Sequence, residues 1–160
     1  MIQFLKIRDV KSPVRDVNEN AGIDIFIPEK SAFTDKELED MDIEDDQIII
    51  LPGEGVIIPL GIKSKFDKDV ALLAVNKSGI ASKKHLIVGA CLVDSSYQGE
   101  LLLHLQNVGN REQKIGFGSK IIQFVPIKIS TEVHTVTTDD NHFYEKETKR
   151  GNGGFGSTGI

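Results

Sequence analysis

The stretch HLIVGACLVDSSYQGELLLHLQNV, residues 85–108, contains two apolar runs separated by a polar turn. The runs, 85–93 and 99–108, are short and rich in Val, Ile and Leu, which is typical of half-buried β-strands. Between them, residues 94–98 supply turn-forming side chains, so CLVDSSYQGEL (91–101) is predicted to be a β-hairpin. The stretch therefore favours an antiparallel β fold.

The same pattern recurs along the chain. Short runs of Val, Ile, Leu and Phe are separated by clusters of Gly, Pro, Asp, Asn or Lys, and no βαβ rhythm is present. Many short strands with turn signals predict an all-β sandwich, a jelly roll or a small barrel. The other predicted strands are IQFLKIR (2–8), QIIILP (47–52), GVIIPLGIKSKF (55–66), DVALLAV (69–75), KIIQFVPIKI (120–129) and TEVHTV (131–136).

Length and composition indicate one soluble domain. The chain has 160 residues, of which 39% are hydrophobic and 27% charged. No apolar run approaches the roughly 20 residues that span a bilayer, and the first residues lack the apolar region of a signal peptide. The single cysteine, Cys91, excludes an internal disulfide. We expect a cytoplasmic protein without membrane association, in the host cytoplasm if a virus encodes it.

The charge is unevenly distributed. The net charge is −5, which argues against a nucleic-acid binder. The segment TDKELEDMDIEDDQ (34–47) has eight acids and one lysine, so it carries −7 and the rest of the chain about +2. Thr34 is suited to cap the only predicted helix, within an insertion of about residues 29–48. This insertion is interpreted as a solvated surface element or as one that binds a partner or an ion.

The chain ends in RGNGGFGSTGI (150–160), which has five glycines. It matches two glycine-rich phosphate-binding patterns by spacing, but neither a preceding strand nor a following helix accompanies it. Its backbone amides and the hydroxyl of Ser157 could still bind an anion, with Arg150 adding charge and Phe155 an aromatic face. We divide the chain into a β domain (1–136), a linker (137–149) and this arm (150–160). The alternative interpretation of the arm is a flexible terminus that binds nothing.

Other candidate residues lie at predicted strand ends. Lys77, Ser78 and Gly79 follow an apolar run and could hold phosphate, or simply form a hairpin turn. Asp94 ends the run 85–93 and is either a turn acid or a general base. Tyr97 could cap the core or form the wall of a pocket.

Two polar residues interrupt predicted apolar strands. The histidines and the single cysteine, by contrast, show no spacing typical of metal ligands. Asp24 in AGIDIF (21–26) and Gln123 in GSKIIQF (118–124) are either outward-facing strand residues or site residues. The four histidines share no metal-ligand spacing and Cys91 has no CxxC partner, so a zinc site is not expected. Cys91 is interpreted as a small buried residue.

Taken in order, five of these stretches resemble the five motifs of the trimeric dUTPase family, over nearly the whole chain. The last stretch matches its motif almost letter for letter. The matching stretches are AGIDIF (21–26), NKSGIA (76–81), CLVDSSYQGEL (91–101), GSKIIQF (118–124) and RGNGGFGSTG (150–159).

The resemblance implies a jelly-roll-like β subunit that assembles as a homotrimer. Three active sites would lie at the subunit interfaces, and the C-terminal arm would close over the bound nucleotide. The implied reaction is hydrolysis of dUTP to dUMP and pyrophosphate with Mg²⁺ as cofactor.

The resemblance also implies roles for particular residues. Asp94 would activate the water that attacks the α-phosphorus, and Tyr97 would pack on the deoxyribose. Asp24 would support the site, through water if it touches the metal. The backbone at Leu92 and Val93 would read the uracil edge. The phosphates would contact Lys77, Ser78, Gly79 and Gln123, and the arm would supply Arg150, Phe155, Gly156 and Ser157, with Phe155 stacking on uracil.

The sequence departs from the family pattern at several positions. Asn76 and Lys77 replace the usual proline and arginine, and Lys120 replaces an arginine. Cys91 replaces a glycine, and Ser96 replaces an aspartate. Two other functions stay open: a deaminase of dCTP built on a related fold, and a nucleotide-binding regulatory module that acts through a protein partner.

Overall fold

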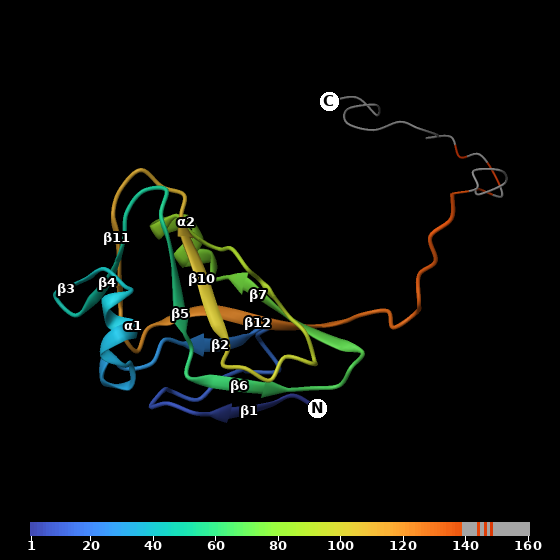
Figure 1. Ribbon diagram of the computed structural model, residues 1–160, viewed down its shortest axis with the longest axis horizontal. Helices are drawn as coiled ribbons and strands as arrows, with labels where there is room; N and C mark the ends of the chain where they lie inside the picture. The colour runs from blue at the N-terminus through green and yellow to red at the C-terminus, as the bar shows by residue number, and fades with distance from the viewer. Residues whose placement is uncertain (139–143, 145, 147, 149–160) are drawn as a thin grey trace.

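The fold is an antiparallel, jelly-roll-like arrangement of short strands, as predicted (Figure 1). The computed structural model describes residues 1–138, 144, 146 and 148. The helical elements are η1 (Lys30–Ala32), α1 (Asp35–Glu39) and α2 (Ser78–Lys84). The strands are β1 (Gln3–Lys6), β2 (Ile23–Phe26), β3 (Ile43–Glu44), β4 (Gln47–Ile50), β5 (Gly55–Pro59), β6 (Ile62–Lys65), β7 (Val70–Asn76), β8 (Leu86–Val88), β9 (Leu92–Val93), β10 (Leu102–Asn107), β11 (Gln113–Gly116) and β12 (Lys120–Lys128).

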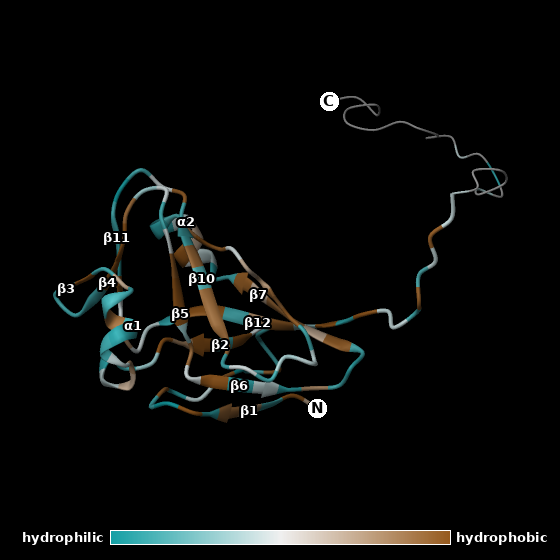
Figure 2. Cartoon of the chain, viewed as in Figure 1, coloured by the Kyte–Doolittle hydropathy of each residue, from teal (hydrophilic) through white to brown (hydrophobic). Residues whose placement is uncertain are grey.

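Four small antiparallel sheets enclose one hydrophobic core. Their strand orders are β1-β6, β5-β10-β8, β11-β4-β3 and β2-β12-β7-β9. The strands carry most of the apolar residues, whereas α1 and much of α2 are hydrophilic (Figure 2). None of the helices in the described part of the chain is long and apolar enough to cross a membrane.

The pair β7–β12 forms the centre of the largest sheet. Its register runs from Asn76 opposite Ile122 to Val70 opposite Lys128. Pro126 lies within β12, yet it is tolerated because β2 pairs with β12 only as far as Phe124, so Pro126 has a free edge on that side. The buried side chains Leu72 and Phe124 anchor this pair in the core.

Three predictions about local structure are wrong. The predicted turn at Ser78 is the start of helix α2, so the acidic segment does not contain the only helix. The run 85–93 is not one strand, because residues 89–91 bend between β8 and β9. The run TEVHTV (131–136) forms no strand within the described chain; it leaves the β domain after β12 (Figure 1).

The acidic insertion is an ordered extension of the β domain. Thr34 caps α1 as predicted: its hydroxyl accepts from the Glu37 amide, and the Glu37 carboxylate accepts from the Thr34 amide. Arg8 holds α1 through two hydrogen bonds to Glu37, of 2.6 and 2.7 Å, and one of 3.1 Å to the Ala32 carbonyl. Its guanidinium also lies over the Phe33 ring, 5.7 Å from the ring centre.

The contact between Arg8 and Glu37 predicts a pH-dependent stability. Hydrogen bonding from Arg8, and then from the Thr34 backbone, lowers the pKa of Glu37 from 4.5 to about 2. A lowered pKa in the folded state stabilises the fold above pH 4.5, and this stabilisation is lost as the pH falls toward 2. In thermal unfolding, the melting temperature of the wild type should therefore exceed that of Glu37→Gln at neutral pH, and the gap should close on acidification.

Glu37→Gln is a matched change because glutamine also serves at this position of a capping box. Asp24, whose pKa is also lowered, is present in both proteins, so its contribution cancels in the comparison. A gap that stays constant between pH 7 and pH 2.5 would show that the charge of Glu37 does not stabilise the fold.

Candidate active site

One cluster of site residues forms around Asp24, at the middle of β2. The carboxylate accepts a hydrogen bond from the ammonium of Lys77 and another, of 2.9 Å, from that of Lys120. The Asp24 side chain is only 15% exposed. Sheet pairing explains this meeting, because Lys77 follows the end of β7 and Lys120 begins β12, the strand that pairs with both β2 and β7.

The electrostatics keep Asp24 ionised. Partial burial acts to raise the pKa of this carboxyl group, but the hydrogen bonds and charges of Lys77 and Lys120 outweigh it, and the pKa lies below its usual value. Since both carboxylate oxygens accept from ammonium groups, Asp24 holds two cations in place at this end of the sheet.

Gln123 joins the same cluster. It lies opposite Asp24 on β2 and opposite Val75 on β7, and its side-chain amide donates to the Asn76 carbonyl at 3.4 Å. The close packing depends on Gly22, because a Cβ there would lie 2.3 Å from the Gln123 Oε1 atom. The sequence motifs containing Asp24, Lys77 and Gln123 are therefore neighbours in the fold.

The first turn of α2 completes this cluster. Lys77 is its N-cap residue, so the amides of Ser78 and Gly79 lie in the first turn, where no intrahelical acceptor exists. A Cβ on Gly79 would meet nothing within 4 Å, so this backbone is open to a ligand. Asn76 is the last residue of β7, and its side-chain oxygen accepts a 2.8 Å hydrogen bond from the Val88 amide. Two lysines and these amides together suit a polyanion.

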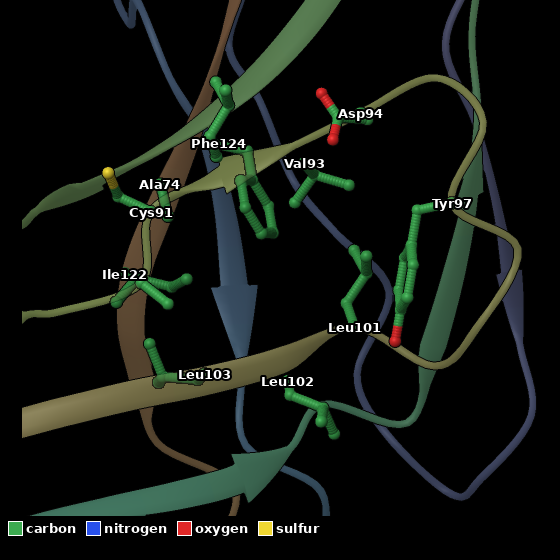
Figure 3. Close-up of a pocket in the computed structure, with 12 residues that line it drawn as sticks. Ala74, Cys91, Val93, Asp94, Tyr97, Leu101, Leu102, Leu103, Ile122 and Phe124 are labelled. Atoms are coloured by element: carbon green, nitrogen blue, oxygen red, sulfur yellow. The ribbon is translucent and has the colours of Figure 1, made fainter.

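A second cluster lines an apolar pocket of about 230 Å³ beneath β9 (Figure 3). Its floor comes from β7, β10 and β12, and its rim from the segment that follows β9. Phe124 lies between Val93 and Ala74 in this view, and Tyr97 lies beside Leu101. The lining residues are Ala74, Ala90, Cys91, Leu92, Val93, Asp94, Tyr97, Leu101, Leu102, Leu103, Ile122 and Phe124.

Asp94 and Tyr97 lie on the rim of this pocket. Asp94 directly follows β9 with an exposed carboxylate, and its carbonyl accepts from the Tyr97 amide at 3.1 Å in a turn. The Tyr97 hydroxyl donates to the Glu100 carbonyl at 2.8 Å. Its ring packs over Gly99, where a Cβ would lie 2.5 Å from the hydroxyl oxygen.

The strand β9 is an edge strand. It pairs with β7 through Val93 opposite Leu72 and Leu92 opposite Leu73, and the described residues provide no partner for its other edge. The predicted hairpin between residues 91 and 101 is therefore wrong as a strand pair, because β10 pairs with β5 and β8 instead. The free edge leaves backbone hydrogen-bonding groups beside the pocket.

Cys91 is exposed, so its interpretation as a buried residue is wrong. Its carbonyl accepts from the Ala74 amide at 2.7 Å, and its side chain contributes to the pocket wall. A ligand bound at this wall of the pocket would therefore contact the Cys91 side chain.

The two clusters lie apart within one chain. Antiparallel pairing of β9 with β7 puts Asp94 beside Ala71, whereas Lys77 is six residues further along the chain, just after the end of β7. At about 3.3 Å per residue, the separation is roughly 20 Å. This distance is several times the length of a hydrogen bond, so Asp94 and Lys77 of the same chain cannot contact the same phosphate.

The described residues contain no group of three or more His, Cys, Asp or Glu side chains that could hold a metal ion. The predicted arm residues Arg150, Phe155, Gly156 and Ser157 lie outside the described residues. Two contacts near the site were not predicted from the sequence. One joins Lys120 to Asp24, and the other joins Arg8 to Glu100. Arg8 and Glu100 are 92 residues apart, and no local pattern joins them.

Comparison with solved structures supports this fold. The dUTPase of Staphylococcus bacteriophage 80alpha with dUpNHpp matches with a TM-score of 0.78 and 21% identity, covering 100% of this chain and 99% of that chain. A mutant dUTPase of phage phi11 of S. aureus, described with a structural Mg(II) ion, matches with a TM-score of 0.70 and 19% identity, over 87% and 97% of the two chains.

Comparison of sequences establishes the family. The dUTPase family model matches residues 40–159, three quarters of the chain. The deoxyuridine 5'-triphosphate nucleotidohydrolase of Haemophilus influenzae (strain PittEE) is 29% identical over 93% of this chain and 97% of its own. That of Hahella chejuensis is 34% identical over 71% of this chain and 73% of its own. The chain belongs to the dUTPase family, as the five motifs predicted.

Proposed function

We propose that the protein is a dUTP diphosphatase, which hydrolyses dUTP to dUMP and pyrophosphate with Mg²⁺. The observation that carries the proposal is an apolar pocket with the Asp94 carboxylate on its rim, on the same subunit as a separate cationic cluster. A nucleotide triphosphate requires both: a pocket for the base and sugar, and cations with amides for the phosphates.

The pocket suits a uracil base. The apolar floor would receive the flat ring, and the free backbone edge of β9 at Leu92 and Val93 would hydrogen-bond to its polar edge. The Cys91 side chain would limit the space in the pocket and so disfavour the extra methyl group of thymine. A fixed pattern of hydrogen-bond donors and acceptors would disfavour cytosine. Tyr97 would pack on the deoxyribose and leave no room for a 2'-hydroxyl.

Asp94 would act as the general base. Its exposed carboxylate would orient a water molecule and accept its proton as the water oxygen bonds to the α-phosphorus. The bond from that phosphorus to the oxygen bridging toward the β-phosphorus would break, and pyrophosphate would leave. Lys77, the amides of Ser78 and Gly79, and Gln123 would hold the phosphate oxygens and offset their charge.

The residues present fit an Mg²⁺ ion that arrives with the nucleotide. Mg²⁺ is often held mainly by substrate phosphates and water, with few protein ligands. Asp24 is engaged by two lysines, so it would support the ion indirectly, through water, rather than as a direct ligand. When bound, Mg²⁺ would neutralise developing charge on the triphosphate.

We infer that the protein acts as a homotrimer with active sites shared between subunits. Because Asp94 and Lys77 of one chain are roughly 20 Å apart, a complete site would take them from different subunits. Exposed apolar side chains supply surface for such assembly. They include Ile57 and Leu102 on the β5-β10-β8 sheet, 60% and 52% exposed, and Val133 and Val136 beyond β12, 93% and 89% exposed. The arm, with Arg150, Phe155, Gly156 and Ser157, would close over the nucleotide.

Pyrophosphate release from four nucleotides tests this function. With Mg²⁺, we expect dUTP to be hydrolysed at least about 100-fold more efficiently than dCTP, dTTP or UTP, because the pocket discriminates by hydrogen bonding and shape. Chelation of the metal should abolish most of this activity.

Each contrary outcome identifies a different alternative. Equal turnover of all four nucleotides would refute the uracil pocket. Ammonia release from dCTP would instead indicate a deaminase. Tight dUTP binding without any hydrolysis would indicate a regulatory module.

A further inference from the structure

Arg8 contacts Glu100, the residue before Leu101 of the pocket lining, as well as the acidic extension. Its guanidinium donates to both carboxylate oxygens of Glu100, at 2.7 and 2.8 Å, while its other N–H groups hold Glu37 and the Ala32 carbonyl. The side chains of Arg8 and Glu100 are each only 17% exposed. Paired, planar hydrogen bonds of this kind fix both position and orientation.

Gly61 adds a third support to Glu100. Its amide donates to a Glu100 carboxylate oxygen at 2.8 Å, and its carbonyl accepts from the amides of Ile7 and Arg8 at 2.8 and 3.3 Å. The backbone at Gly61 has a φ of +69°, and a Cβ there would lie 3.1 Å from the Arg8 Cβ. Glycine therefore lets the chain pass close enough for Arg8 and Glu100 to meet.

The backbone of Glu100 in turn holds Tyr97. The Glu100 carbonyl accepts from the Tyr97 hydroxyl, and the ring lies over Gly99 beside Leu101 (Figure 3). Tyr97 is 44% exposed, so packing alone does not fix the ring. Its orientation depends on an anchor whose own side chain is held by Arg8.

We propose that Arg8 is a positioning residue that sets the Tyr97 ring at the pocket rim through Glu100, with Glu37 of the acidic extension as its second anchor. The proposal gives the extension a role in substrate selection that does not require a partner protein. It rests on the proposed function only for the identity of the sugar that Tyr97 contacts.

The first test follows the ring without any substrate. The chain has two tyrosines, Tyr97 and Tyr144, so ring signals from ¹³C-labelled tyrosine can be assigned with Tyr144→Phe. Arg8→Lys keeps the charge but cannot bond to two carboxylates in paired fashion. We expect it to shift or broaden the Tyr97 signals, whereas Lys114→Gln, which removes a surface ion pair with Glu44, should leave them unchanged.

The second test uses the ratio of kcat/KM for dUTP to that for UTP. We expect Arg8→Lys to lower this ratio about fivefold, mainly through KM, and Tyr97→Phe to lower it as well. Because both changes act through one hydrogen bond, the double variant should be no worse than Tyr97→Phe alone.

These readouts separate failure of the inference from failure of the proposed function. Unchanged Tyr97 signals in Arg8→Lys, or losses that multiply in the double variant, would overturn the role of Arg8. A lower melting temperature with an unchanged ratio would reduce Arg8 to a structural residue. A wild type that does not hydrolyse dUTP would refute the proposed function, while the ring signals would still test the link between Arg8 and Tyr97.

Discussion

Asp94→Asn is expected to lower kcat for dUTP by about 10³-fold, within the range of roughly 10²–10⁴ that a general base contributes. The asparagine amide can still orient a water molecule but cannot accept its proton. Asp94 is exposed on the pocket rim and makes no side-chain hydrogen bond within the described part of the chain, so its replacement should not disturb the fold. Steady-state kinetics and calorimetric binding of a non-hydrolysable dUTP analogue measure the two effects separately.

Binding should change little in this variant, because the Asp94 carboxylate is not among the groups proposed to hold the base or phosphates. Asp45→Asn provides a matched control, since it removes an exposed acid in the turn between β3 and β4, which does not line the pocket, and it should retain full activity. An Asp94→Asn protein with kcat within threefold of the wild type would remove Asp94 from the mechanism.

The antiparallel β fold could be predicted because its signal is local. Short Val- and Ile-rich runs punctuated by turn residues indicated most strands, and Thr34 marked the start of α1 as its expected N-cap residue. Helix α2 was missed because NKSGIASKK lacks a strong capping residue: Lys77 provides no side-chain cap. The strand predicted at 131–136 has the right residue types but no partner among the described residues, and a strand needs one.

The site was predictable only in part, because the contacts between its residues depend on pairing of strands that are far apart in the sequence. Asp24, Lys77 and Gln123 could be named from motifs, but their meeting depends on β12 pairing with both β2 and β7. The separation of Asp94 from Lys77 follows from the β9 register, which no sequence pattern specified. Arg8 had no signal at all, because its two carboxylate partners lie 29 and 92 residues away.

Co-expression of two inactive variants tests most directly whether the two clusters act together on one dUTP. Asp94→Asn lacks the base, and Lys77→Ala lacks a phosphate-binding cation, so each homotrimer should be nearly inactive. If each site takes Asp94 and Lys77 from different chains, random assembly of equal amounts should leave about a quarter of the sites with both wild-type residues.

The measurement is pyrophosphate release from dUTP by mixed oligomers, purified through a different affinity tag on each variant. Purification through both tags removes the homotrimers, and each remaining mixed trimer has one complete site of its three. The account therefore predicts recovery of roughly a third of the wild-type rate, from parents that are about 100-fold or more below it. A rate no higher than the sum of the two parents, in oligomers shown to contain both chains, would contradict the shared site.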